Sequence, residues 1–159
     1  MSKLTHIDEH NNAIMVDVSN KDSTLRVATA TGKIYMSKES FEIVESHANK
    51  KGDVLTIAQV AGIMGAKKTS ELVPLCHPLL ISKANLTFAP IKEKDKYGYI
   101  ANSEIIVQGQ TGAEMEAINA VQVGLLTIYD MCKAVDKRMI ITEVHLVSKS
   151  GGKSGDFKF

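Results

Sequence analysis

The sequence predicts an α+β domain of the ferredoxin-like kind, with an antiparallel sheet covered by helices. Three observations carry this prediction: a long amphipathic stretch over 111–137, two alternating segments before it at 84–89 and 99–108, and a further strand-like segment at 139–147. The β-β-α-β order, with two shorter helices in front, is typical of helices packed on an antiparallel sheet. Of the 159 residues, 44% are hydrophobic, which is enough for one domain with a sizeable core, expected over 14–159. Residues 1–13 are polar, so we expect them to be flexible.

The first half is predicted to hold a short hairpin followed by a helix. Residues 25–31 alternate in polarity, Gly32 is expected to turn the chain, and 33–36 to pair back. Ser37 is a candidate N-cap for a helix that runs to about residue 48. The inner face of this helix is expected to hold Phe41, Val44 and Ala48.

A second helix follows a break at Lys50-Lys51-Gly52. Asp53 can cap it, and it reaches the basic pair Lys67-Lys68, whose charge complements the helix dipole. The residues expected to face inward are Ile57, Val60, Ala61 and Met64.

After a strand pair joined by the charged loop 92–98 comes the long helix 111–137. Thr111 is its candidate N-cap, and Glu114 three residues later would complete a capping box. At 100° per residue, its apolar face comprises Ala117, Val121, Gly124, Leu125, Ile128, Met131, Cys132 and Val135.

The opposite arc of this helix mixes polar and apolar side chains. It comprises Glu116, Asn119, Gln122, Val123, Leu126, Asp130, Lys133 and Lys137. A solvated face rarely keeps two aliphatic residues at its centre, so we expect this arc to be covered, by another subunit. Glu114 and Asp130 lie roughly 24 Å apart along the axis. If both ends of the helix are functional, the site is therefore shared between chains.

Composition and charge exclude several classes of function. A net charge of +1, aromatic residues at 5% and the absence of Trp argue against a nucleic-acid partner. No apolar run is long enough for a membrane span, and the N-terminus lacks the apolar stretch of a signal peptide. Cys76 and Cys132 suit a reducing compartment, so we expect a cytoplasmic protein.

Two further segments carry chemistry. In 72–79, LVPLCHPL, prolines hold Cys76 and His77 rigidly. For an isolated Cys-His pair, a buried thiol and a hydrogen-bonded core imidazole are about twice as frequent as a functional pair, and a zinc site is less favoured still. The segment 148–156, SKSGGKSGD, combines a glycine-rich backbone with Lys149 and Lys153. It is interpreted equally well as a phosphate-binding cradle or as a flexible, solvated tail.

Asp130 and Lys133 form an ordinary i,i+3 salt bridge on the simplest interpretation. If the arc is covered, the neighbouring Lys133 and Lys137 would repel each other. Desolvation and repulsion would then lower a lysine pKa toward the range useful for proton transfer.

Five blocks together resemble the cyclic pyranopterin monophosphate synthase (MoaC) family of molybdenum cofactor biosynthesis. They are Lys51-Gly52-Asp53, PLCHPL at 74–79, GAEMEA at 112–117, YDMCKA at 129–134 and KSGGKSGD at 149–156. The resemblance runs in order from about 15 to 157.

The resemblance implies a ferredoxin-like lyase that converts 3′,8-cyclo-7,8-dihydro-GTP into cyclic pyranopterin monophosphate and diphosphate. It implies a hexamer, a trimer of dimers, with active sites at the dimer interface. No cofactor is required and no metal site is expected, although Mg²⁺ can accompany the triphosphate. By position, the catalytic residues would be Asp130, Lys51 and Lys133. The substrate-binding residues would be Leu75, Cys76, His77, Glu114, Met115, Glu116, Arg26, Lys67, Lys149 and Lys153.

Small departures from the family pattern bear on triphosphate affinity. Lys68 replaces a usual Arg and loses bidentate phosphate geometry, and Gly65 replaces a usual Ala. Two other classes stay open: a nucleotide-triphosphate-binding regulatory module on the same fold, and a structural assembly subunit. Turnover of ligand, as against binding alone, separates them from the enzyme.

Overall fold

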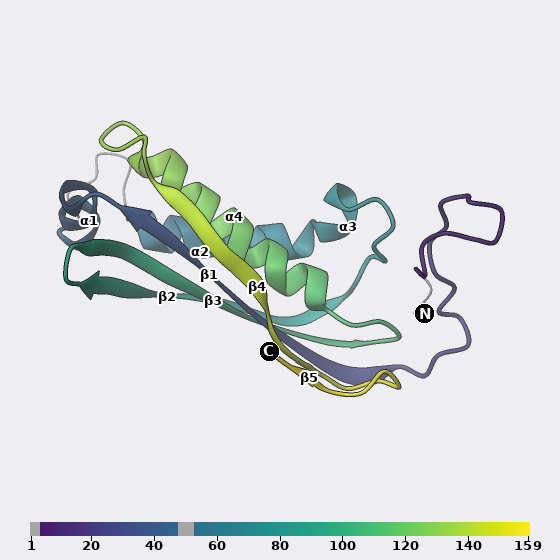
Figure 1. Ribbon diagram of the computed structural model, residues 1–159. Coiled ribbons are helices and arrows are strands. Elements are labelled where there is room, and N and C mark those ends of the chain that lie inside the picture. Colours follow the sequence, from purple (N-terminus) through teal and green to yellow (C-terminus); the bar gives the residue numbers. More distant parts are fainter. Residues whose placement is uncertain (1–3, 48–52) are drawn as a thin grey trace.

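The computed structural model describes residues 4–47 and 53–159. In chain order the elements are β1 (Thr24–Met36), α1 (Lys38–Glu45), α2 (Val54–Lys67), α3 (Thr69–Leu72), β2 (Ile81–Glu93), β3 (Lys96–Gly109), α4 (Glu114–Cys132), β4 (Ile140–Ser150) and β5 (Phe157–Lys158). The strands form one antiparallel sheet in the order β2-β3-β1-β4-β5. With β5 set aside, this is the split β-α-β arrangement of ferredoxin-like domains, so the predicted fold class is confirmed. Helices α2 and α4 run across one face of the sheet (Figure 1).

Strand β1 is the centre of the sheet and contradicts the predicted turn at Gly32. It continues unbroken from Thr24 to Met36 and pairs with β3 on one side and β4 on the other. Gly32 lies beneath α4, where an added Cβ would come within 2.8 Å of the side chains of Val121 and Val144. Glycine is present here because the helix approaches the strand closely, not because the chain turns.

The predicted strand pair is present and longer than expected. Strands β2 and β3 pair from Glu93↔Lys96 at the hairpin end to Ile81↔Val107. The turn therefore occupies only residues 94–95 of the predicted loop 92–98.

Helix α4 forms as predicted, but both of its ends differ. Its N-cap is Ala113, which provides no side-chain hydrogen bond, so the predicted Thr111–Glu114 capping box is wrong. Glu114 instead pairs with Lys149 on β4. The helix ends at Cys132, which places Val135 and Lys137 beyond it. The rest of the predicted apolar face is buried: Ala117, Val121, Gly124, Leu125, Ile128, Met131 and Cys132.

The two earlier helices confirm the predicted caps. The Ser37 side chain accepts a hydrogen bond from the Ser40 backbone N–H, and the Asp53 side chain from that of Thr56. Phe41 and Val44 are buried as expected, while Ala48 lies outside the described residues.

The predicted inner face of α2 is wrong. Ile57, Val60 and Met64 are 40%, 59% and 40% exposed. The buried face consists of small residues and one valine: Val54, Ala58, Gly62, Gly65 and Ala66. Small residues face inward because α2 lies tightly against α4.

This packing also revises the prediction for the polar arc of α4. Asn119 on that arc donates a hydrogen bond from Nδ2 to the Gly65 carbonyl on α2 at 2.8 Å. An added Cβ at Gly65 would reach the side chain of Val123. Part of the arc is therefore covered by the same chain, whereas Gln122 and Leu126 are exposed. No helix among the described residues is long and apolar enough to cross a membrane.

Candidate functional site

The first of two neighbouring hollows is built around Arg26 on β1. Its guanidinium donates from Nε to the Gly109 carbonyl at 2.9 Å and from Nη2 to the Gln110 carbonyl at 3.1 Å. Arg26 is only 7% exposed, so two backbone carbonyls hold a nearly buried cation in one orientation. The hollow has a volume of about 490 Å³ and is lined by Lys21, Asp22, Thr24, Arg26, Gly152, Lys153 and Ser154.

The glycine-rich segment after β4 forms one wall of this hollow. Gly151 and Gly152 have φ values of +86° and +87°, which L-residues rarely adopt. At Gly152 a side chain would also collide with the Arg26 guanidinium. The Asp156 carboxylate accepts a hydrogen bond from the Gly151 backbone N–H at 3.2 Å, and β5 then pairs back on β4. The segment is thus folded against the sheet as a tight turn.

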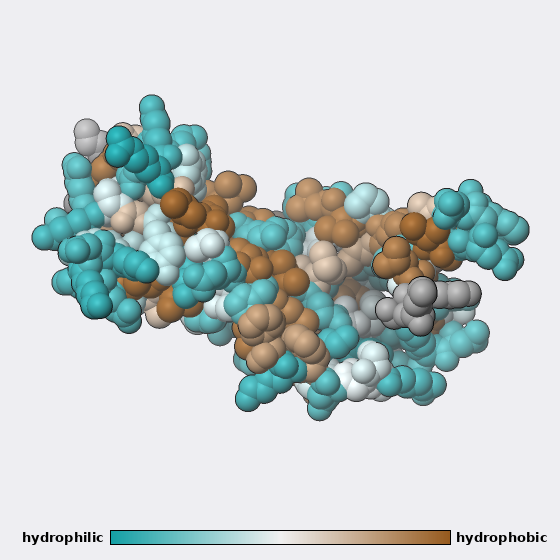
Figure 2. All heavy atoms as spheres, viewed as in Figure 1, coloured by the Kyte–Doolittle hydropathy of each residue, from teal (hydrophilic) through white to brown (hydrophobic). Residues whose placement is uncertain are grey.

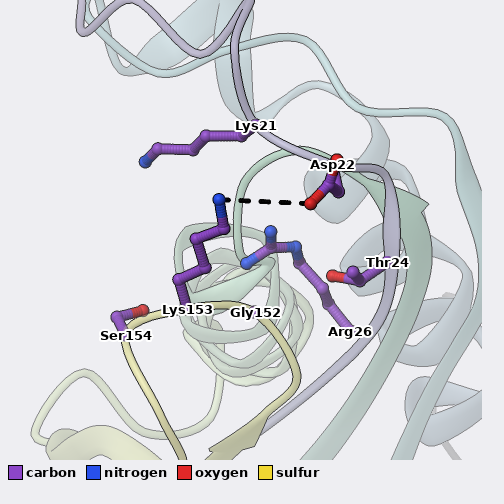
Figure 3. A pocket seen from close by; sticks show the side chains of 7 residues that line it. All are labelled: Lys21, Asp22, Thr24, Arg26, Gly152, Lys153 and Ser154. Atoms are coloured by element: carbon purple, nitrogen blue, oxygen red, sulfur yellow. Dashed lines mark ion pairs between the residues drawn. The ribbon is translucent and has the colours of Figure 1, made fainter.

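The charge in this hollow is predominantly positive. Arg26 and Lys153 direct their nitrogen atoms toward each other, Lys21 extends along the rim beside them, and Asp22 is the one carboxylate among the described lining residues (Figure 3). Lys153 Nζ lies 4.0 Å from the Asp22 carboxylate. The three cations and the turn make a cradle suited to a polyphosphate. No pattern in the sequence indicated Lys21, because this residue stands in a polar stretch outside the five blocks that resemble the family.

The second hollow, the cavity, has a volume of about 750 Å³. The segment 73–77 forms one side and the start of α4 with the loop before it forms another. Among the described residues the lining comprises His6, Ala13, Val73, Pro74, Leu75, Cys76, His77, Thr111, Gly112, Glu114 and Met115. Five of the predicted substrate-binding residues therefore lie around one space: Leu75, Cys76, His77, Glu114 and Met115.

Glu116 lies behind Cys76 and is the most unusual carboxyl group in the described structure. It is 2% exposed, and burial raises its pKa to about 7. Its Oε1 accepts a hydrogen bond from Cys76 Sγ at 3.8 Å, while Oε2 has no partner among the described residues. Near neutral pH this group can both hold and release a proton.

Cys76 is set up as a proton-bearing thiol. Burial raises its pKa to about 11, and the Glu116 carboxyl adds to that rise. Because the thiolate is the reactive form of cysteine, this environment disfavours nucleophilic chemistry at Sγ. The simplest interpretation of the sequence was a buried thiol at Cys76. In the structure Cys76 is half-buried and borders the cavity.

An ion pair connects the cavity with the cradle. Lys149 Nζ lies 2.8 Å from Glu114 Oε1, and their side chains are 29% and 26% exposed. Glu114 lines the cavity, while Lys149 lies near the end of β4, two residues before Gly151 in the turn that borders the cradle. Arg26 also reaches the loop at Gly109 and Gln110 that leads to the cavity. The two hollows are therefore neighbouring parts of one surface region.

The predicted catalytic residues at the other end of α4 are not part of this region. Asp130 is sixteen residues from Glu114, or roughly 24 Å along the helix. Lys133 Nζ lies 2.6 Å from Asp130 Oδ1. Lys51 lies outside the described residues, and Lys67 lines a separate groove with Leu79 and Lys83.

In the single chain the pKa of Lys133 is not lowered, and the lowering expected for an arc covered by another subunit stays a prediction. Asp130 raises the pKa of Lys133 through a hydrogen bond and its negative charge. Both side chains are more than half exposed, and Lys137 stands beyond the end of the helix. The conditions assumed for the shift, burial and a lysine one helical turn away, are therefore absent from this part of the described chain.

The fold and the two hollows define an α+β, ferredoxin-like protein with a cationic cradle beside a cavity that holds acid, thiol and imidazole groups. A family model described as the MoaC family matches residues 15–152, and the chain belongs to this family. The chain is 52% identical over 158 residues to a protein of Clostridium perfringens named cyclic pyranopterin monophosphate synthase, covering 99% of each chain. Proteins of the same name from Clostridium botulinum and Campylobacter jejuni are 53% and 52% identical, covering 98% of this chain and 97% and 98% of theirs.

Proposed function

We propose that this protein is a cyclic pyranopterin monophosphate synthase, a lyase that converts 3′,8-cyclo-7,8-dihydro-GTP into cyclic pyranopterin monophosphate and diphosphate. The observation that carries the proposal is the identity of about half of all residues, over nearly the full length, to relatives that bear this name. The pairing of a cationic cradle with a proton-bearing cavity gives a physical basis for the same reaction.

The cradle is proposed to hold the triphosphate. Arg26 is fixed by two carbonyls, so its remaining N–H groups are available to phosphate without a large loss of side-chain entropy. Loss of diphosphate builds negative charge on the leaving group, and Arg26, Lys21 and Lys153 would stabilise it. Lys149 would contribute after exchanging its contact with Glu114 for a phosphate oxygen.

Mg²⁺, where it takes part, is proposed to arrive on the phosphates. No group of three or more His, Cys, Asp or Glu side chains suitable for a metal ion is found within 4–47 and 53–159. Phosphate oxygens are ordinary Mg²⁺ ligands and would bring the ion to the cradle with the substrate.

The cavity is proposed to take the purine-derived ring system. Rebuilding those rings needs proton transfers at nitrogen and oxygen, for which a carboxyl group with a pKa of about 7 is well suited. Glu116 would exchange protons through Cys76, its hydrogen-bonding partner, and His77 would take part at the cavity wall.

The proposed catalytic residues Asp130 and Lys133, together with Lys51, would come from a second copy of the chain. Roughly 24 Å of helix separates Asp130 from the cavity in one chain, so a site that uses both ends needs two chains. Apolar side chains exposed on α2 and α4 support such an assembly. They are Ile57, Val60, Met64 and Leu126. We propose a hexamer built as a trimer of dimers, located in the cytoplasm, where the thiols of Cys76 and Cys132 stay reduced.

The test is an anaerobic incubation of purified protein with the cyclised dihydro-GTP, following diphosphate release and pterin formation. We expect product from the wild type and none from Lys51→Ala or Lys133→Ala. Lys137→Ala, an exposed lysine beyond the end of α4, is the matched control and should stay active. Tight binding without product in the wild type would favour the regulatory module. Near-normal turnover in both Lys51→Ala and Lys133→Ala would refute their catalytic role.

A mixing experiment tests whether the site is shared. Co-expression of Arg26→Ala and Lys133→Ala chains would place two intact halves in the same site in some dimers. Random pairing restores about a quarter of the sites, so recovery toward that fraction supports a shared site. Activity no greater than that of the single variants would show that each chain works alone.

A further inference from the structure

Residues 4–14, here called the arm, form a small hairpin ahead of the domain. Ile7 and Ala13 form an antiparallel bridge, and the Ile14 backbone N–H donates to the His6 carbonyl at 3.0 Å. At the tip, Asp8 Oδ1 accepts hydrogen bonds from the backbone N–H groups of His10 and Asn12, each at 2.8 Å. Asn12 Nδ2 also donates to Asp8 Oδ2 at 3.1 Å. The arm therefore has a defined shape of its own, set by its Asp8 turn.

The arm lies beside the cavity, and its two bridge-side residues line it. His6 and Ala13 are part of the same cavity wall that includes Cys76, His77 and Met115. His10, at the tip of the arm, is not among the lining residues. One histidine of the hairpin therefore borders the cavity and the other does not line it.

Apolar side chains also gather at the base of the arm. Leu4, Ile7 and Ile14 are 78%, 45% and 40% exposed. In Figure 2 the tip of the arm is hydrophilic and hydrophobic atoms collect where the arm meets the body. Apolar surface beside a cavity is stabilised when a largely flat ring system fills the space.

The His6 ring has a defined hydrogen-bonding partner. Its Nδ1 lies 3.4 Å from the Ile14 carbonyl oxygen, which can only accept. In the neutral ring this contact favours the tautomer that carries the proton on Nδ1, which leaves Nε2 as an acceptor. A guanine-derived ring carries N–H donors on its ring nitrogens and exocyclic amine, and these complement such an acceptor.

We propose that the arm is one wall of the substrate site and that His6 is a substrate-binding residue that accepts a hydrogen bond from the purine-derived ring. The inference rests on the proposed function for the identity of that ring. It adds a residue outside the five blocks that carried the family resemblance. It also gives the arm a role that its polar composition alone would not indicate.

The kinetic test compares two histidines on the same hairpin. We expect His6→Ala to raise KM for the cyclised dihydro-GTP by roughly 3- to 10-fold, the value of one hydrogen bond, with a smaller effect on kcat. His6→Gln, which keeps an acceptor, should recover part of the loss. His10→Ala is the matched control and should match the wild type. Equal KM values for His6→Ala and His10→Ala would overturn the proposal.

A second test needs no turnover. Alkylation of Cys76 by iodoacetamide, followed by mass spectrometry on the full chain, reports access to the cavity, and Cys132, which is 2% exposed, is the internal reference. Asp8→Ala removes the turn contacts and should speed Cys76 modification by roughly threefold or more, while His10→Ala should not. Identical Cys76 rates in the wild type and Asp8→Ala would refute the arm as a cavity wall.

The two proposals can fail separately. A wild-type protein that makes no product overturns the enzyme assignment, and the alkylation rates still decide whether the arm covers the cavity. A wild type that makes product while His6→Ala behaves like His10→Ala overturns the role of His6 alone.

Discussion

Glu116 offers a prediction whose magnitude follows from its burial. An ordinary Glu has a pKa near 4.5, whereas burial raises that of Glu116 to about 7. Below pH 4.5 the carboxyl group is protonated in both the folded and unfolded chain and causes no loss of stability. As the pH rises to 7, the unfolded chain ionises first, so the free energy of unfolding falls. At about 1.4 kcal/mol per pH unit, the full loss is about 3 kcal/mol.

Glu116→Gln should abolish that loss because a neutral amide replaces a carboxyl group that ionises. Gln also keeps an oxygen that can accept the hydrogen bond from Cys76 Sγ. We therefore expect the difference in unfolding free energy, Gln variant minus wild type, to rise by about 2 to 3 kcal/mol between pH 4.5 and pH 8.

Urea denaturation at half-unit pH steps, followed by circular dichroism, measures this difference. Glu71→Gln, on the exposed surface of α3, is a matched control that corrects for the general effect of removing one carboxylate. A difference that stays flat from pH 4.5 to pH 8 would show that Glu116 is not held in its protonated form, and the proton-exchange role proposed for it would fall with it.

Three further substitutions test the cradle and the helix caps. Gly152→Ala would force a methyl group against the Arg26 guanidinium. We therefore expect diphosphate release to fall about 10-fold or more, while the far-ultraviolet circular dichroism spectrum stays unchanged. Near-normal diphosphate release would argue against a cradle at this position. Ser37→Ala removes the hydrogen bond that Ser37 accepts from the Ser40 backbone and should lower the free energy of unfolding by about 1 kcal/mol in urea titrations. Thr111→Ala should have no comparable effect, because Ala113 holds the N-cap position of α4; an equal loss would restore the capping box.

Local signals in the sequence were sufficient for two helix caps, for the β2–β3 pair and for the interior of α4. Ser37 and Asp53 were identified as caps because a cap bonds to a backbone N–H three residues away. The β2–β3 pair and the interior of α4 followed from their periods of two and 3.6 residues. The same local logic failed at Thr111, because Glu114 is drawn away by Lys149, a partner 35 residues further along the chain.

Helix α2 shows why periodicity alone misjudged a buried face. Large apolar residues were assigned to the core, yet Val60 is exposed and Gly62 is buried. At Gly62 an added Cβ would meet the side chain of Leu86 and the carbonyl of Ala120, both on other elements. Which stripe of an apolar helix faces inward depends on how closely its neighbour approaches, and no pattern within α2 encodes that distance.

The features of the candidate site also fall into those that the sequence indicated and those that only the packed chain brought together. The sequence by itself determined the long helix, the strand pair before it and the strand after it, the family, and the residue types available for phosphate binding and proton transfer, because these depend on local pattern and composition. Only the tertiary structure placed Glu116 against Cys76, Gly152 against Arg26 and the arm beside the cavity. Those contacts join residues 40 or more positions apart, and burial, which sets the pKa of Glu116, is a property of the packed chain.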